Sequence, residues 1–389
     1  MIHKLDSHTH TLASGHAYNT IMEMAKAAVF MGANEPFAVR TFPVTATPAG
    51  YGRSRLLASG ICGTDVHFHS GRLPIAAHTI IGHEFVGRLE DADPAEAERF
   101  GLKVGDNVIA DIAVPCGECL LCKTGDDANC VHMGVTNGGS IDAAPYLYGG
   151  YVEVNYTPLT NLIRIPDSLD PVMTATFACP GPTAIHAFTL AQRAGVDVAK
   201  TNTAVVQGLG PVGCFAVMYL KAIGVKTVYA VTAGNNEKRE RLAMSLGADE
   251  VFYLTRMGTQ AVTERLQKEN GGLGVDLCFE ASGAPAAVPQ GMEILRNRGV
   301  YLVPGQYSNS GSVAIAPQLI TFKALHIIGS SQYSVSDVRQ YLDFLVAHNE
   351  LHERILTLGS RYTIDRINDA FADAKSGCNI KTLLVGEEG

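Results

Sequence analysis

The segment Gly208-Leu209-Gly210-Pro211-Val212-Gly213 constrains the fold more than any other part of the chain. It follows the apolar run 204–206, with only Gln207 between them, and precedes a helical pattern that continues through residue 220. In a strand, turn and helix of this kind, the first glycine permits the tight turn, the second lets backbone approach a pyrophosphate and the third allows close helix packing. The helix N-terminus, at Pro211 and Val212, offers free N–H groups to the anion. These residues predict a dinucleotide site, with a glycine-rich loop that binds nothing as the alternative.

Apolar runs at 227–231, 276–279 and 300–303 alternate with helical patterns after this turn, which predicts βαβ units and a parallel sheet. Short strand-like runs separated by Gly and Pro, such as 27–30 and 107–110, predict a β-rich region before it. A helix is expected at 336–347 with Ser336 as its N-cap, followed by a strand at 380–385 that can pair back onto the first region. At 389 residues the chain exceeds one ordinary core, so we expect a two-domain α/β protein.

The residues after the second strand of the parallel sheet bear on the choice of dinucleotide. A carboxylate at that strand end normally accepts hydrogen bonds from the ribose hydroxyls of NAD, and none stands there. Asn235 and Arg239 are candidate contacts, and Lys238, Arg239 and Arg241 could meet the 2′-phosphate of NADP. The same basic residues could simply be solvated charges on an exposed first helical turn. The sequence therefore does not decide between NAD and NADP as the cofactor.

Four cysteines with the spacing C-x2-C-x2-C-x7-C lie close together in the sequence. Thiolates this close can surround one tetrahedral zinc ion, and a closed four-sulfur shell leaves no position for a substrate. The pattern therefore predicts a structural zinc site at Cys116, Cys119, Cys122 and Cys130. An iron–sulfur cluster or four reduced thiols are the alternatives.

Two further segments, Gly60-Ile61-Cys62-Gly63-Thr64-Asp65 and Gly82-His83-Glu84, offer the mixed sulfur and nitrogen ligands of an open zinc site. A third ligand is then required. Cys179 is the candidate because its segment lies at the junction of the two proposed domains, although composition alone would make it a buried core cysteine.

These motifs, in this order, resemble those of the zinc-containing medium-chain alcohol dehydrogenases from about residue 24 to the C-terminus. The resemblance implies a GroES-like β-rich catalytic domain (24–181 and 323–389) interrupted by a Rossmann domain with a doubly wound parallel sheet (182–322). It implies catalytic zinc on Cys62, His83 and Cys179, with the fourth position left for water or alcohol. The expected activity is hydride transfer between an alcohol and NAD(P). The resemblance favours a secondary alcohol or a polyol as that substrate.

The resemblance also implies roles for residues around the metal. Thr64 would contact the alcohol, and His67 would receive the proton through the cofactor ribose, although alone it would be an ordinary surface histidine. Asp65 would orient His83, and Glu84 would lie behind the metal, able to replace water.

On the cofactor side, the resemblance assigns Thr183 to the nicotinamide, and Gly305 and Gln306 to the loop that holds the carboxamide. Lys381 replaces an arginine near the pyrophosphate, which keeps the positive charge but loses the bidentate fork. A solvated C-terminal charge is its ordinary interpretation.

Composition sets the remaining expectations. The formal net charge of −8, the scattered basic residues and the absence of a long apolar stretch predict neither a nucleic-acid nor a membrane partner. Nine cysteines without a secretory segment predict a cytoplasmic protein with metal ligands or buried thiols. The strand-like run 324–328 matches an edge that similar proteins pair across a dimer, so we expect a homodimer or homotetramer.

Two segments fit the dehydrogenase pattern less well. Residues 133–151, with Tyr146 and Tyr148, could shape the substrate pocket or form an ordinary strand face.

Residues 1–28 resemble the start of PHP-type metallophosphoesterases, in which His8 and His10 would bind metal, but further ligands are lacking. We expect residues 1–23 to be a disordered extension. A metal-dependent phosphoesterase and a catalytically inactive zinc and dinucleotide sensor are the alternative functions.

Overall fold

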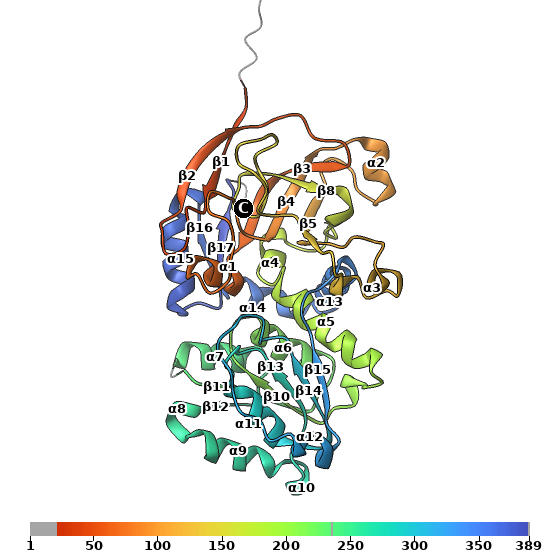
Figure 1. Ribbon diagram of the computed structural model, residues 1–389, viewed down its shortest axis with the longest axis vertical. Helices are drawn as coiled ribbons and strands as arrows, with labels where there is room; N and C mark the ends of the chain where they lie inside the picture. Colours follow the sequence, from red (N-terminus) through yellow and green to blue (C-terminus); the bar gives the residue numbers. More distant parts are fainter. Residues whose placement is uncertain (1–21, 235, 388–389) are drawn as a thin grey trace, which may run out of the picture.

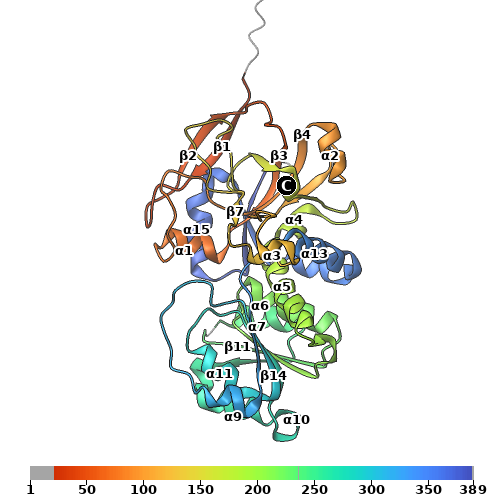
Figure 2. The same ribbon diagram turned by 45° about the vertical axis from the view of Figure 1, so that its right-hand side comes forward.

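Two large β-sheets organise the chain in the computed structural model, which describes residues 22–234 and 236–387. Each sheet forms the centre of one lobe, and Figure 1 shows the lobe of residues near both ends of the chain above the lobe of the middle residues. The helices α4 (Pro171–Ala175), α5 (Pro180–Arg193) and α13 (Val335–Ala347) lie where the lobes meet (Figures 1 and 2). One hydrophobic core runs through both lobes at this junction, including Leu57, Phe215 and Tyr341.

The first sheet is mostly antiparallel, with strand order β16-β17-β3-β4-β5-β9 and β8 paired to β3. Its last strand, β17, returns from the far end of the chain to pair antiparallel with β3, as predicted for 380–385. The strands are β3 (Tyr51–Gly60), β4 (Glu84–Asp91), β5 (Asn107–Ala110), β8 (Val154–Pro158), β9 (Leu162–Arg164), β16 (Gly359–Tyr362) and β17 (Lys381–Val385).

The second sheet has six parallel strands in the order β12-β11-β10-β13-β14-β15, the doubly wound order of a dinucleotide-binding fold. Every residue of the central strands β10 and β13 is buried, because helices cover both faces of the sheet. The strands are β10 (Thr203–Gln207), β11 (Thr227–Thr232), β12 (Glu250–Tyr253), β13 (Val275–Glu280), β14 (Leu295–Val303) and β15 (His326–Gly329).

The helices and small strands complete the lobes. The remaining helices are α1 (Gly63–His69), α2 (Pro94–Arg99), α3 (Leu120–Lys123), α6 (Pro211–Ala222), α7 (Glu237–Ser245), α8 (Leu254–Met257), α9 (Thr259–Gln267), α10 (Glu269–Gly272), α11 (Ala287–Ile294), α12 (Gln318–Lys323), α14 (His352–Leu356) and α15 (Ile367–Ser376). Two further antiparallel pairs are β1 (Met24–Val29) with β2 (Ala38–Pro43), and β6 (Ala113–Val114) with β7 (Gly134–Val135). None of the helices in the described part of the chain is long and apolar enough to span a bilayer.

The structure confirms the predicted α/β fold class and differs from the sequence expectations in three local features. The parallel sheet extends past the expected boundary at residue 322, because β15 pairs with β14. Helix α13 begins at Val335 with a capping box formed by Ser334 and Asp337, so Ser334 rather than Ser336 is its N-cap. Residues 136–153 contain no strand, and Tyr146 has a φ of 65°, which a strand does not permit.

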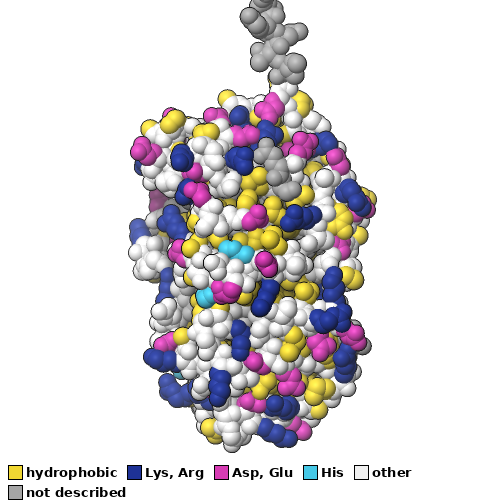
Figure 3. Space-filling view, turned by 180° about the vertical axis from the view of Figure 1, so that it is seen from behind, with side chains coloured by type: hydrophobic (Ala, Val, Ile, Leu, Met, Phe, Trp, Pro, Cys, Tyr) yellow, Lys and Arg dark blue, Asp and Glu magenta, His cyan; other side chains and the backbone are white. Residues whose placement is uncertain are grey.

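The predicted N-terminal extension lies almost entirely outside the described residues, as do its candidate ligands His8 and His10. The first strand of the described residues, β1, begins at Met24, where the dehydrogenase pattern was expected to start. On the face seen in Figure 3, acidic and basic side chains are interspersed over both lobes, around a hydrophobic area in the upper lobe.

Candidate active site

Four side chains with metal-binding atoms converge near the junction of the lobes. Cys62 follows β3 as the N-cap of α1, and His83 immediately precedes β4. Since β3 and β4 pair with Gly60 opposite Glu84, both residues reach the same end of the sheet. Cys179 arrives from the N-cap of α5. The ligand atoms of Cys62, His83, Glu84 and Cys179, here called the mixed cluster, all lie within 4.8 Å of one another.

The geometry of the mixed cluster fits zinc. The Sγ atoms of Cys62 and Cys179 are 4.0 Å apart, close to the roughly 3.8 Å expected between two sulfurs on one tetrahedral zinc. A hydrogen bond from Cys179, together with the charges of His83 and Lys381, lowers the pKa of Cys62 well below its usual value despite burial. The Cys62 thiolate that a metal requires is therefore favoured by its surroundings.

His83 is held from behind by a carboxylate. Its Nδ1 lies 3.4 Å from Asp65 Oδ1, and both side chains are buried. Burial alone would lower the pKa of His83, but the charges of Asp65 and Cys62 outweigh it and raise the pKa. With Nδ1 facing Asp65, Nε2 is left to face the cysteines, which is the arrangement of a metal-binding histidine and its orienting carboxylate.

Glu84 is paired with Lys381, and this differs from the sequence expectation for the lysine. The Lys381 ammonium contacts Glu84 Oε2, and neither side chain has any exposed surface. A Cβ at Gly60 would overlap both groups, so the glycine is needed to admit them. Burial raises the pKa of Glu84 to about 7, while Lys381 opposes this. Lys381 is therefore neither a solvated charge nor open to a pyrophosphate in this structure, because β17 directs it inward.

The second candidate metal site is built from one continuous loop. The sulfurs of Cys119 and Cys122 are 3.5 Å apart, and two further pairs in the cluster are 4.0 Å apart. Backbone amides donate to these sulfurs, and amides of the loop lower the pKa of Cys119 to about 6. Burial and the Cys119 thiol raise the pKa of Cys122 to about 12, so a bound cation would be needed to keep this thiol ionised at neutral pH. The members of this four-cysteine cluster are Cys116, Cys119, Cys122 and Cys130.

The glycine-rich turn has the geometry expected of a dinucleotide site. Gly208 has a φ of 97°, and a Cβ there would meet the backbone of Ser282 at 2.7 Å. A Cβ on Gly213 would overlap the Gly208 carbonyl oxygen, so the third glycine lets α6 start close to the turn. Gly210, the N-cap of α6, faces open space, and Pro211 and Val212 begin the helix. The turn thus leaves room beside the free N–H groups of the helix N-terminus.

The other predicted cofactor residues lie around this turn or near the mixed cluster. Thr183 lies one helical turn after Cys179 and donates to its carbonyl oxygen at 2.8 Å. Gln306 donates to the Ala284 carbonyl oxygen at 3.2 Å, and a Cβ on the neighbouring Gly305 would meet Glu280 Oε2 at 2.5 Å.

Arg239 lies on the first turn of α7, where Lys238 is exposed but Arg239 itself is partly buried. Its Nε donates to the Gly377 carbonyl oxygen at 2.7 Å, and Nη1 donates to that of Leu209 at 3.4 Å, within the glycine-rich turn. Lys238 donates to Asn379 Oδ1 at 2.7 Å. Asn235 lies outside the described residues.

Comparison with known proteins agrees with both lobes. Residues 54–167 match the family model described as alcohol dehydrogenase GroES-like domain, and residues 211–347 match the one described as zinc-binding dehydrogenase. The chain belongs to the zinc-containing medium-chain alcohol dehydrogenases. It is 29% identical to 5-exo-hydroxycamphor dehydrogenase of Pseudomonas putida, over 93% of this chain and 99% of that protein.

Two further proteins support the same assignment. The erythritol/L-threitol dehydrogenase of Mycolicibacterium smegmatis is 30% identical, over 76% of this chain and 80% of that enzyme. A zinc-binding dehydrogenase of Sinorhizobium meliloti 1021, solved with NADP bound, superposes with a TM-score of 0.79 at 26% identity, over 94% of this chain and 100% of that one. This dehydrogenase is thus a zinc-dependent oxidoreductase that transfers a hydride between an alcohol and NAD(P), and neither alternative function is favoured.

Helix α1 places the two remaining predicted residues of the dehydrogenase beside the mixed cluster. Thr64 Oγ1 lies 3.8 Å from Cys62 Sγ. His67, one turn further along α1, is partly buried, and its pKa is lowered by this burial and by the charge of Arg72. A neutral imidazole therefore persists at neutral pH, which is the form that can accept a proton.

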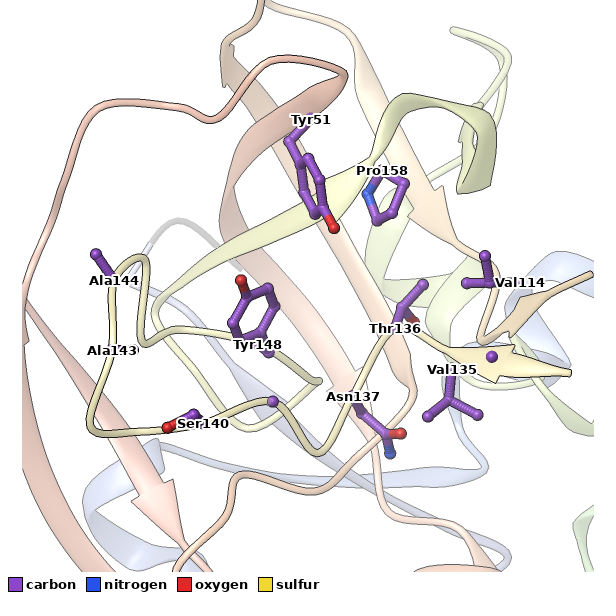
Figure 4. Close-up of a pocket in the computed structure, with 12 residues that line it drawn as sticks. Tyr51, Val114, Val135, Thr136, Asn137, Ser140, Ala143, Ala144, Tyr148 and Pro158 are labelled. Carbon is purple, nitrogen blue, oxygen red and sulfur yellow. The ribbon is translucent and has the colours of Figure 1, made fainter. Parts of the chain in front are cut away.

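The segment 133–151 lines a cavity of about 360 Å³ (Figure 4). Tyr51 and Tyr148 form one side of the cavity, and Thr136, Asn137 and Ser140 come from the loop that closes it. Its lining includes no residue of the mixed cluster. The loop therefore shapes a cavity of its own, which corrects the interpretation of Tyr146 and Tyr148 as a strand face.

Two contacts around the mixed cluster have no signature in the sequence. Tyr151 donates its hydroxyl to Asp65 Oδ2 at 2.7 Å, and Lys381 pairs with Glu84. Each contact joins two residues that are far apart in the chain, so no local spacing of residues in the sequence indicates it. Only the resemblance, which drew attention to a basic residue at position 381, could have indicated the second.

Proposed function

We propose that Cys62, His83 and Cys179 hold the catalytic zinc, and that the four-cysteine cluster holds a structural zinc. The single observation that supports the first site best is the convergence of its ligand atoms within 4.8 Å, from three separate segments at the junction of the lobes. A zinc ion held by these three residues would supply a Lewis acid that makes an alcohol hydroxyl more acidic and so favours hydride transfer to NAD(P). In the four-cysteine cluster all ligand positions are filled by protein, so that ion contributes stability.

The surrounding residues of the chain orient the substrate and move the proton. The Thr64 hydroxyl, beside Cys62, contacts the substrate hydroxyl, and His67 accepts the released proton at its imidazole. Asp65 fixes the ring of His83. Glu84 is held behind the ligands by Lys381 rather than directed at the substrate.

We propose a secondary alcohol or a polyol as the substrate. The relatives named above, a hydroxycamphor dehydrogenase and an erythritol/L-threitol dehydrogenase, carry names from these two classes. The pyrophosphate of the cofactor lies on Gly208, Gly210, Pro211, Val212 and Gly213 in this proposal. Thr183, Gly305 and Gln306 meet the nicotinamide, and Arg239 meets the adenosine ribose, with Asn235 proposed as a contact from the sequence alone.

The proposal also covers the domain division, the oligomeric state and the location of the enzyme. The enzyme divides into a catalytic domain and a dinucleotide-binding domain that includes β15. The free edge of β15, with Ile327 42% exposed and Phe322 nearby 77% exposed, favours a homo-oligomer that extends the sheet. A reducing, cytoplasmic location is favoured because all nine cysteines are free.

The test combines metal analysis with cofactor absorbance. Purified protein is incubated with a panel of secondary alcohols and polyols, with NAD or NADP, and with or without a chelator. We expect two zinc ions per chain and a chelator-sensitive rise in reduced-nicotinamide absorbance. Cys62→Ser should lose one zinc and the activity, whereas Cys378→Ser, which removes an exposed thiol outside both clusters, should change neither. Full activity in the Cys62→Ser protein would contradict the site.

A further inference from the structure

The carboxylate behind His83 is itself held in place from the other side. Asp65 is fully buried, and its Oδ2 accepts two hydrogen bonds, from the Cys62 backbone N–H at 3.0 Å and from the Tyr151 hydroxyl at 2.7 Å. Its other oxygen, Oδ1, lies toward His83 Nδ1. A buried carboxylate needs donors to stay ionised, and these two donors also fix which oxygen faces the histidine.

The ring of Tyr151 is held as firmly as its hydroxyl. The side chain is fully buried, and the rings of Phe37 and Phe371 meet it nearly perpendicularly at centroid distances of 6.2 and 5.9 Å. The Tyr151 backbone carbonyl accepts from the Ala28 N–H of β1 at 2.9 Å. The Tyr151 hydroxyl therefore reaches Asp65 from a closely packed, fully buried side chain.

Tyr151 also contacts the chain directly before His83. Gly82 has a φ of 89°, and a Cβ there would meet the Tyr151 ring at 2.6 Å. The ring thus packs against the backbone that carries His83, while the hydroxyl bonds the carboxylate that orients it. Burial, and then the charge of Asp65, raise the pKa of Tyr151 well above its usual value, so the hydroxyl keeps its proton and remains a donor.

We propose that Tyr151 is a positioning residue of the catalytic site, which fixes the Asp65 carboxylate and the Gly82 backbone so that His83 keeps its orientation toward the metal. This rests on the proposed function, because the ion it serves is the catalytic zinc. Partners behind a metal-binding histidine typically change metal affinity by about 10- to 100-fold when removed. Tyr151 acts one contact further out, so we expect an effect of about tenfold, at the lower end of that range.

The decisive variant is Tyr151→Phe, which removes the hydroxyl and keeps the ring against Gly82. Zinc release to a chromophoric chelator is followed over time in the unmodified protein and in the variant. The phase from the four-cysteine cluster is identified with Cys62→Ser protein, which retains only that ion. We expect catalytic zinc to leave about tenfold faster in Tyr151→Phe, with release from the four-cysteine cluster unchanged. Cobalt substituted at the catalytic site should show shifted d–d bands in the variant.

Tyr156→Phe is the matched control. Tyr156 is equally buried, and its hydroxyl donates to the Thr45 carbonyl oxygen at 2.7 Å, in the same lobe. Loss of the Tyr156 hydroxyl should lower the free energy of unfolding without accelerating zinc release. Because Tyr151 acts through Asp65, adding Tyr151→Phe to an Asp65→Asn protein should accelerate release further by less than twofold.

The outcomes separate this inference from the proposed function. Unchanged zinc release and cobalt bands in Tyr151→Phe, or equal acceleration in Tyr156→Phe, would overturn the positioning role. An additive effect in the Asp65→Asn protein would show that Tyr151 does not act through the carboxylate. An active unmodified protein with only the structural zinc would overturn the proposed function and this inference together.

Discussion

The mixed cluster and the four-cysteine cluster use similar ligands but are assembled in opposite ways. The four cysteines lie within one loop of fifteen residues, 116–130, and three of them are partly exposed. The mixed cluster gathers residues 62, 83, 84 and 179 from the end of β3, the start of β4 and the start of α5, and three of its four members are buried. One loop can form the local cluster by itself, whereas the mixed cluster exists only once β3, β4 and α5 have packed together. The first is therefore suited to holding a loop and the second to chemistry at the junction.

The environments of the two clusters differ as much as their assembly. Backbone amides surround the sulfurs of the four-cysteine cluster. Ionisable side chains surround the mixed cluster, with Asp65 behind His83 and Lys381 on Glu84. A closed shell of amide-bonded thiolates resists exchange, whereas an open site with neighbouring charges allows a ligand position to change during reaction. The predictions below test whether the clusters are functionally as separate as this comparison implies.

The largest effect is expected from Cys62→Ser. Loss of the catalytic zinc removes several kcal/mol of transition-state stabilisation, so kcat should fall by at least about 10³-fold. The four-cysteine cluster is untouched, so far-ultraviolet circular dichroism should be unchanged and one zinc per chain should remain. Loss of both ions in this variant would show that the clusters are coupled.

His67→Gln should lower kcat/KM for alcohol oxidation by about 100-fold, the lower range for loss of a general base. Burial and Arg72 lower the pKa of His67, so the proton-accepting form is present above that pKa and lost as the pH falls through it. The unmodified enzyme should show this acidic limb in its pH profile, and the variant should not. Zinc content should stay at two ions per chain. An acidic limb that survives in the variant would assign the proton to another group.

Gly82→Ala should disturb the mixed cluster selectively. Gly82 has a positive φ, a conformation that destabilises any residue with a side chain by about 1 kcal/mol or more. The new methyl group would also meet the Tyr151 ring. We expect reduced catalytic zinc occupancy and about tenfold lower activity, with the four-cysteine cluster fully loaded. Gly63→Ala is the matched control, because a Cβ there meets nothing within 4 Å. Equal losses in both variants would argue against the Tyr151 contact.

Cys119→Ser should have the smallest effect on catalysis. The closed shell is broken, so the loop loses its ion and the melting temperature should fall by on the order of 5 °C. At low temperature, kcat should stay within about twofold of the unmodified enzyme, because the cluster contains no reacting group. A collapse of kcat with an unchanged melting temperature would contradict the division of roles.

The same contrast explains what could be predicted from the sequence. Local patterns, such as the cysteine spacing and Gly208 to Gly213, fix a geometry within one turn or loop, and the structure places these residues as the spacing implied. The partner of Lys381 could not be read in this way, because it depends on β17 pairing with β3 beside Glu84. Tyr151 and Asp65 are 86 residues apart and meet only through the packed core. The alternation around Leu147 suggested a strand, which the positive φ of Tyr146 excludes.

The most direct test of the account is anomalous diffraction at the zinc edge from crystals of fully active protein. We expect two peaks per chain, one inside the four-cysteine cluster. The other should lie about 2.0–2.3 Å from Cys62 Sγ, His83 Nε2 and Cys179 Sγ. An active preparation with no peak among these three residues would contradict it.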